Sequence, residues 1–150
     1  MTRTRWILHA TDFSAASRPA FAKALELAKQ DGARLFLMHV LVPPSPFLGD
    51  KLPSSYVELD ERARRDAGRQ LAAAVTRAEK AGIRVESSLV EGVPAEMILR
   101  AARRHRPDMI VIGTHGRTGL RRALMGSVAE RVLQRATRPT LTVRGPKRAR

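Results

Sequence analysis

The sequence predicts an α/β fold in which an open parallel sheet carries helices on both faces. Short apolar runs alternate with segments of helical periodicity along the 150 residues, and this alternation is typical of strand–helix–strand units. The runs at 6–8 and 109–112 are almost continuously apolar, as strands are when both faces of a parallel sheet are buried. Right-handed crossovers between five such strands give a single-domain sheet of the Rossmann-like or flavodoxin-like kind.

The boundaries of the elements follow from the residues that begin and end each pattern. Strands are expected at 5–11, 35–42, 83–90, 109–112 and 140–143. Helices are expected from Ser14 to Gly32, from about 55 to 81, from Pro94 onward, and from about 126 to 136. Pro94 suits the first turn of a helix, and Pro139 suits the start of a strand, where a missing N–H is tolerated.

Apolar residues at helical spacing mark the face that each helix is expected to bury. Ser14 is the expected N-cap of the first helix, and Gly32 is expected to end it in a left-handed conformation. The expected inward positions are Phe21, Ala24, Leu25 and Ala28 in the first helix, Ala67, Leu71, Ala74, Val75 and Ala78 in the second, Ile98, Ala101 and Ala102 in the third, and Val128, Val132, Leu133 and Ala136 in the last.

Residues 43–53 are expected to form a long connection between the second strand and the second helix. Its first four residues include three prolines, which prevent a regular hydrogen-bonded ladder. The segment is longer than most α/β connections, so we expect either a lid or a stretch without fixed structure.

A glycine-rich segment follows the fourth strand and leads into the last helix. It contains Gly113, Gly116 and Gly119 and ends in Gly126 and Ser127. Glycines let backbone N–H groups approach a ligand closely, and a helix start adds unpaired donors and the positive end of a dipole. The same residues also suit a tight turn followed by a serine cap. The layout favours a cradle for the phosphates of a nucleotide or another phosphate-bearing ligand.

The glycine spacing also carries a family resemblance. Gly113, Gly116, Gly126 and Ser127 fit the pattern G-x2-G-x9-G-[ST], and the segments 7–14 and 37–40 precede it in the expected order. In these features the chain resembles the nucleotide-binding branch of the universal stress protein family. The resemblance implies the strand order 3-2-1-4-5, binding of ATP, or of AMP or ADP, and a homodimer formed through the last strand, 140–143. Pairing of that strand would cover an otherwise exposed edge.

Three strand ends are expected to meet at one crevice, because open α/β sheets bind ligands where the strand order reverses. These ends carry Thr11 and Asp12, Val40, and Gly113. Asp12 suits a ribose hydroxyl or a nucleotide-borne Mg²⁺ held through water, and it equally suits a turn. In the family, the backbone at the position of Val40 pairs with the adenine edge.

The remaining candidate residues would surround the base and the phosphates. Thr11 and Ile112 would flank the base and sugar, and Val128 opens the helix after the glycine loop. His115 and Arg117 are candidates for neutralising phosphate charge, with exposed loop residues as the alternative. His9 and His39 lie in strands, where packing in the core is the expected role.

Several kinds of site are excluded by what the sequence lacks. The chain has no cysteine, which excludes disulfides and thiolate metal sites. No histidine pair has metal-ligand spacing on a helix, so no metal is expected beyond Mg²⁺ brought by a nucleotide. The P-loop and dinucleotide fingerprints are missing, and the glycine loop holds no lysine. The family resemblance implies a nucleotide-responsive stress regulator, and the missing catalytic groups lead us to expect no catalytic residues. A slow ATPase or nucleotide hydrolase is the alternative.

The net charge of +14 raises nucleic-acid binding as a further alternative. The arginines are scattered along every helix and aromatic residues make up only 4%, so this alternative is the weakest. We expect a domain at 1–145 followed by a basic tail at 146–150. No run approaches the roughly 18 apolar residues of a membrane span, and a cytoplasmic protein is expected.

Overall fold

The computed structural model describes residues 3–43, 53–115 and 125–145. Its centre is a five-stranded sheet in the order β3-β2-β1-β4-β5, in which every neighbouring pair is parallel. This order and the helices around it confirm the fold predicted from the sequence. The strands are β1 (Trp6–Ala10), β2 (Arg34–Leu41), β3 (Val85–Glu91), β4 (Met109–Gly113) and β5 (Thr140–Val143).

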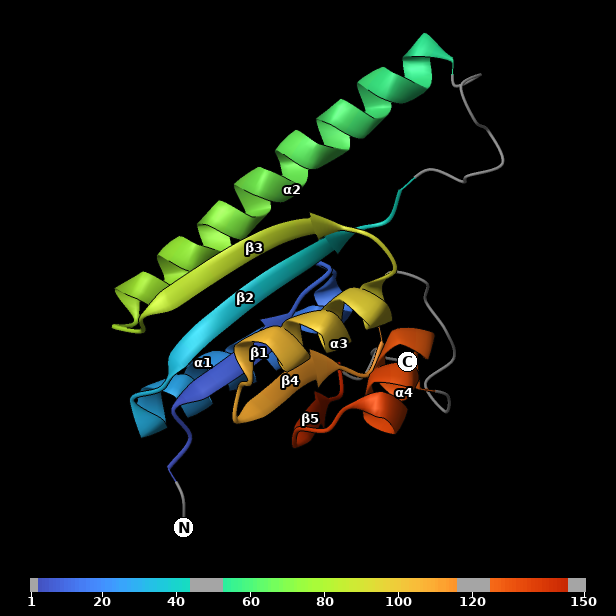
Figure 1. The fold of residues 1–150 in the computed structure, drawn as a ribbon. Coiled ribbons are helices and arrows are strands. Elements are labelled where there is room, and N and C mark those ends of the chain that lie inside the picture. The colour runs from blue at the N-terminus through green and yellow to red at the C-terminus, as the bar shows by residue number, and fades with distance from the viewer. Residues whose placement is uncertain (1–2, 44–52, 116–124, 146–150) are drawn as a thin grey trace, which may run out of the picture.

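The helices lie in two layers, one on each face of the sheet (Figure 1). α1 and α2 contact the strands on one face, and α3 and α4 pack against each other on the opposite face. A short 3-10 helix, η1, precedes α1. The helices are η1 (Ala15–Ser17), α1 (Arg18–Asp31), α2 (Ser54–Lys80), α3 (Pro94–His105) and α4 (Ser127–Arg135).

The sheet is buried on both faces, as its apolar strands predict. Successive strand residues point to opposite faces, and Ile7 and Leu8 are both 0% exposed. Leu8 belongs to the core beneath α3 and α4, whereas Ile7 belongs to the core beneath α1. α1 places Ala20, Ala24 and Ala28, all fully buried, along the face that meets the sheet. Small side chains at this spacing let the helix backbone lie close to β1 and β4.

Two expectations about the helices were wrong in detail. Ser14 caps η1, because its Oγ accepts the Ser17 N–H at 3.2 Å, and α1 begins only after this turn, with Pro19 in its first turn. Leu133 is 40% exposed, whereas its neighbour Val132 is fully buried. One residue step turns a helix by about 100°, so Val132 points into the core and Leu133 points away from it.

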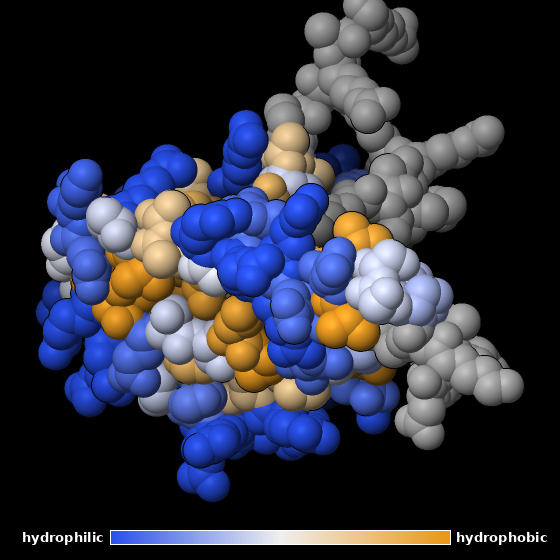
Figure 2. Space-filling view, turned by 90° about the horizontal axis from the view of Figure 1, so that it is seen from above, coloured by the Kyte–Doolittle hydropathy of each residue, from blue (hydrophilic) through white to orange (hydrophobic). Residues whose placement is uncertain are grey.

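α2 is much longer than the strands it covers. Its buried residues are Ala67, Leu71 and Ala78, and its N-terminal half extends beyond the sheet in Figure 1. Hydrophilic residues cover most of the face drawn in Figure 2, where apolar residues form small separate areas. Within the described residues, no helix is long and apolar enough to cross a membrane. Residues 44–52 of the predicted connection at 43–53 and the predicted tail at 146–150 lie outside the described residues.

A pair of matched substitutions tests the assignment of the core. Leu99→Ala in α3 removes a side chain that is 4% exposed, and it should lower the free energy of unfolding by about 2–5 kcal/mol. Leu133→Ala makes the same change at an exposed position and should cost under about 1 kcal/mol. Urea unfolding of both variants measures the difference, and equal losses would place Leu133 in the core after all.

Candidate functional site

The strand order reverses between β1 and β4. At this point β1 ends before its neighbours β2 and β4 do. The chain runs outward from β1 through β2 to β3 and then returns to the other side of β1 as β4. Pairing of β1 with β2 ends at Ala10 and Met38, and pairing of β1 with β4 ends at His9 and Val111. Because β2 and β4 continue past these pairs, the switch point beyond the end of β1 is where an open α/β sheet is expected to have its ligand crevice.

The backbone of Val40 faces this crevice. Met38 O accepts the Thr11 N–H at 3.0 Å, so Met38 presents its backbone polar groups to β1. Leu41 O accepts the Gly92 N–H at 2.9 Å, so Leu41 presents its groups to β3. These directions alternate along a parallel strand, and Val40 therefore directs its N–H and C=O toward the side of β1, beyond the last pair. An N–H donor and a C=O acceptor stand side by side there.

A tight turn carries the chain away from the end of β1. Asp12 Oδ1 accepts the Ser14 N–H at 2.9 Å, and Thr11 Oγ1 accepts the Phe13 N–H at 3.0 Å. Between them, Phe13 has a φ of 61°, which is uncommon for a residue with a side chain. Thr11 Oγ1 also lies 3.3 Å from Ser17 Oγ in η1. One carboxylate oxygen of Asp12 is thus engaged in the turn, as the turn interpretation of this residue expects.

Two buried histidines brace the three strand ends. His9 Nδ1 donates to the carbonyl of Val111 at 2.8 Å, and His39 Nδ1 donates to the carbonyl of Thr11 at 2.7 Å. The ring of His9 also stacks on Phe21 of α1, and that of His39 packs against Phe13. Burial lowers the pKa of His9 from 6.5 to about 4, against the raising effects of the Val111 carbonyl and the Asp12 charge. His9 is therefore neutral at neutral pH, and both histidines have the packing role expected of them.

The start of α4 is held directly against the end of β4. The Thr114 N–H donates to Val143 O at 3.0 Å, and Thr114 O accepts the Gly126 N–H at 2.7 Å. A Cβ on Gly126 would lie 3.0 Å from that same Thr114 oxygen, too close without a shift of the backbone. The close contact between loop and helix therefore favours glycine at this position.

The first turn of α4 presents unpaired donors. Gly126 is the N-cap and supplies no side-chain cap, so Ser127 is the exposed first helical residue and not a cap. The first intrahelical bond runs from the Glu130 N–H to Gly126 O at 3.0 Å. The N–H groups of the preceding residues, 127–129, have no intrahelical acceptor, and they lie at the positive end of the helix dipole. Such a helix start can hold an anion.

The described candidate residues gather at this carboxyl edge of the sheet. Gly113 lies beside η1, since a Cβ on it would be 3.6 Å from Ser17 Cα. His115 Nδ1 lies 2.9 Å from Thr114 Oγ1. Ile112 is 3% exposed, and its side chain packs in the core beneath α3 and α4. Gly116, Arg117 and Gly119 lie outside the described residues. Of the histidine, aspartate and glutamate side chains in the described ranges, no three are grouped as a metal site.

The model of the universal stress protein family matches residues 4–144 of the chain. The chain belongs to the universal stress protein family. A curated relative, universal stress protein MJ0531 of Methanocaldococcus jannaschii, is 38% identical over 138 residues, which cover 92% of this chain and 81% of the relative.

Solved structures share the fold of this universal stress protein. The structure of MJ0577, also from Methanocaldococcus jannaschii, superposes with a TM-score of 0.82 at 27% identity and covers 95% of this chain and 96% of its own. A universal stress protein from Archaeoglobus fulgidus in complex with dAMP gives a TM-score of 0.65 at 24% identity. It covers 95% of this chain and 100% of its own. A universal stress protein in complex with cAMP gives a TM-score of 0.70 at 23% identity and covers 97% of this chain and 100% of its own.

Some residues that shape the site of this universal stress protein were missed by the sequence analysis. Thr114 is buried and connects β5, α4 and His115 through hydrogen bonds. It lies in the glycine-rich segment but was not among the predicted site residues. The sequence Asp12-Phe-Ser14 does carry the signal of an Asx turn, because aspartate often accepts the N–H two residues on. No local signal indicates that Phe13 adopts a positive φ.

Acidification should destabilise the fold through His9. The unfolded chain takes up this proton near pH 6.5 and the folded chain only near pH 4, so the unfolded state binds more protons in between. The free energy of unfolding has its full value above pH 6.5. It decreases as the pH falls below that value, by up to about 1.4 kcal/mol per pH unit. Urea unfolding from about pH 7 to about 4.5 measures the slope for the unmodified protein and for His9→Leu, which should lack this component. Parallel pH curves for the two proteins would contradict the assignment.

Proposed function

We propose that this universal stress protein binds an adenine nucleotide, ATP or its shorter relatives ADP and AMP, and acts as a nucleotide-responsive regulator. One observation carries the proposal: the open backbone pair of Val40 and the donor-rich start of α4 border the same end of the sheet. The first suits the edge of a base, and the second suits a phosphate. A nucleotide is a ligand that presents both groups at once.

The base would pair with Val40. Adenine offers an acceptor at N1 beside the amino donor at N6, so the Val40 N–H would donate to N1 and its C=O would accept from N6. Guanine offers a donor at N1 beside an acceptor at O6 and would leave both backbone groups opposed to like groups. Thr11 and Ile112 would bound the base and sugar, and Asp12 would face the ribose or a Mg²⁺ that arrives with the nucleotide.

The phosphates would lie at the start of α4. Gly113 and Gly126 allow the backbone to approach closely, and the N–H groups of Ser127 and Val128 in the first turn have no acceptor within the helix. His115 would add charge beside them. Gly116, Arg117 and Gly119 belong to the proposal through their sequence pattern, as the part of the loop that wraps the phosphates.

The comparisons support the class of ligand. The dAMP and cAMP complexes of two universal stress proteins share the fold of this chain at 24% and 23% identity. These ligands carry an adenine base and differ in their phosphate groups. The likeness therefore favours an adenine nucleotide in general and leaves the number of phosphates to experiment.

We further propose regulation through a cytoplasmic homodimer, with binding rather than turnover as the molecular event. β5 is at the end of the strand order, so its outer edge is available for pairing with a second copy. Thr114 N–H bonds to Val143 O, which connects β5 to the loop before α4. A nucleotide that orders this loop would thereby act on the dimer edge.

Two glycine substitutions test the phosphate end. Gly126→Ala places a Cβ 3.0 Å from Thr114 O and should displace the start of α4, weakening ATP binding by about tenfold or more in calorimetric titration. Gly68→Ala is the matched control, because a Cβ there meets nothing within 4 Å in the middle of α2. It should leave ATP affinity unchanged and stabilise the fold by about 0.5–1 kcal/mol. Full ATP affinity in Gly126→Ala would remove the α4 start from the site.

Base selectivity tests the Val40 end. ATP should bind at least about tenfold more tightly than GTP to nucleotide-stripped protein, because guanine mismatches two backbone hydrogen bonds. The two ligands carry the same phosphates and charge, so competition measured at one salt concentration isolates the base. Equal affinity would mean that the Val40 backbone does not contact the base.

A further inference from the structure

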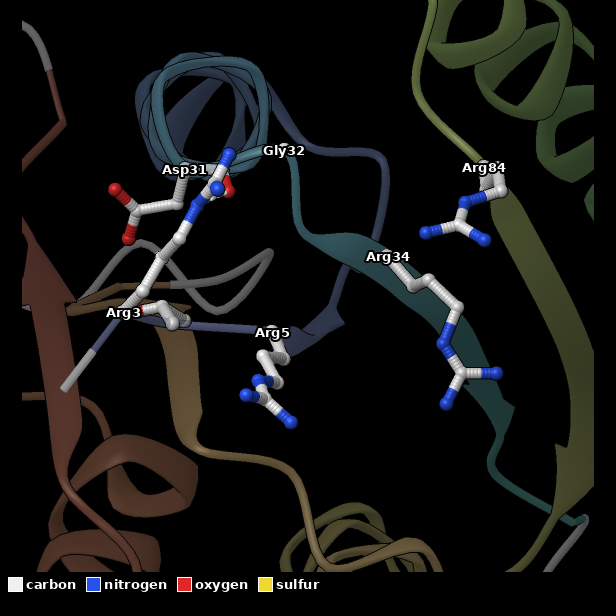
Figure 3. A pocket seen from close by; sticks show the side chains of 7 residues that line it. Arg3, Arg5, Asp31, Gly32, Arg34 and Arg84 are labelled. Carbon is white, nitrogen blue, oxygen red and sulfur yellow. Dashed lines mark hydrogen bonds between the residues drawn. The ribbon is translucent and has the colours of Figure 1, made fainter.

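A cavity lies at the opposite, amino-terminal edge of the sheet. It has a volume of about 390 Å³ and is lined by Arg3, Thr4, Arg5, Asp31, Gly32, Arg34 and Arg84. Figure 3 shows Arg3 on the side of Asp31 and Gly32, at the end of α1, with Arg84 reaching in from the side of β3. We call this cavity with its four arginines the arginine basin. The strands are parallel, so the basin and the nucleotide crevice are separated by the length of the sheet.

The backbone fixes three of the arginines side by side. Arg5 O accepts the Arg34 N–H, and Arg84 O accepts the Leu35 N–H, both at 2.8 Å. Arg5, Arg34 and Arg84 therefore lie next to one another where β1, β2 and β3 begin. The carboxylate of Asp108 lies beside this row, where its Oδ2 accepts the backbone N–H groups of Arg5 and Trp6 at 2.8 and 2.9 Å, and it forms no ion pair with an arginine among the described residues.

The positive charge of the basin is only partly balanced. Asp31 is the one carboxylate in its lining, and Arg3 donates to the backbone carbonyl of Asp31. Arg34 approaches Glu86 at 3.5 Å in an exposed pair, which contributes little. Among the described residues, Arg5 and Arg84 have no ion pair and no side-chain hydrogen bond. A concave surface lined by one sign of charge concentrates counter-ions of the opposite sign.

We propose that the arginine basin binds a compact polyanion that carries two or more phosphate groups. Guanidinium groups bind phosphate through paired hydrogen bonds, and four arginines line the basin, three of them at the starts of β1, β2 and β3. The volume is within the range of small-molecule sites, about 300–1,000 Å³. The lining contains no aromatic residue, so it lacks the stacking surface that single-stranded nucleic acid uses. The site is independent of the nucleotide crevice.

The protein contains its own reporter for this site. Trp6 is the only tryptophan of the chain, and the Arg34 guanidinium lies 4.3 Å from the centre of its ring. An anion that draws Arg34 into the basin alters this cation–π contact and with it the fluorescence of Trp6. A ligand in the crevice at the other edge leaves the contact in place.

The test is a titration of the full chain, stripped of nucleotide, with inorganic tripolyphosphate, followed by Trp6 fluorescence and calorimetry. The double variant Arg5→Gln/Arg84→Gln removes the two arginines without side-chain partners and should weaken binding by about tenfold or more. Arg62→Gln/Arg65→Gln removes the same charge from the exposed part of α2 and should change affinity by less than about twofold. Thermal unfolding confirms that both variants are folded.

Four results would overturn the proposal: no change in Trp6 fluorescence, equal weakening in both double variants, loss of the fluorescence response in Gly126→Ala, or preferential binding of a single-stranded RNA oligonucleotide. Equal weakening would indicate a general charge effect. Loss in Gly126→Ala would place tripolyphosphate in the nucleotide crevice. An RNA that binds more tightly through the same arginines would make the basin a nucleic-acid surface. Tripolyphosphate binding that survives Gly126→Ala and fails in Arg5→Gln/Arg84→Gln supports the basin, whether or not the crevice binds ATP.

Discussion

The end of β1 is the constraint on which the carboxyl edge of the sheet depends. β1 stops pairing at His9 and Ala10, while β2 and β4 continue on either side of it. Two buried histidine bonds, His9 to Val111 O and His39 to Thr11 O, connect these three strands where they diverge. A buried polar group left without its partner costs about 1–3 kcal/mol, so each bond resists a slip of the register. If β1 extended by two residues, it would pair with the backbone N–H and C=O of Val40, which would then be closed to a ligand.

The two proposed sites, one at each edge of the sheet, would hold an anion by different means. At the carboxyl edge the donors are backbone N–H groups of α4, which the contact between Gly126 and Thr114 O holds in position. Fixed dipoles of this kind lose little entropy on binding and suit one ligand geometry. At the amino edge the donors are guanidinium groups on long side chains, which carry full charge but must be ordered by the ligand. The carboxyl edge therefore favours selectivity between ligands, and the amino edge favours long-range attraction of negatively charged ligands.

The sequence was sufficient for the fold and for part of the site, for a physical reason. Strands buried on both faces must be apolar throughout, and helices must show an apolar stripe. Local patterns in the sequence therefore predict the order of strands and helices. Gly126 and Asp12 were also recognisable, because a close backbone approach and a turn each demand a residue type. The positive φ of Phe13 and the exposure of Leu133 depend on packing against distant segments. The clustering of Arg5, Arg34 and Arg84 depends on strand register, and in the sequence these residues belong to a general scatter of arginine.

α1 reaches from the carboxyl edge of the sheet to the amino edge, so it would determine whether binding at one proposed site affects the other. Its start, through Ser17 of η1, lies beside Thr11 and Gly113, and its end, at Asp31 and Gly32, lines the arginine basin. A helix that could slide would couple the two edges. Ala20, Ala24 and Ala28 are fully buried against the sheet, and a screw displacement of the helix by one residue would bring Phe21, Leu25 and Lys29 to the same close contact. Coupling requires an element with two arrangements of similar free energy, and a tightly packed alanine face disfavours a second one. We therefore expect α1 to act as a spacer between the two proposed sites, so that each would bind its ligand without the other.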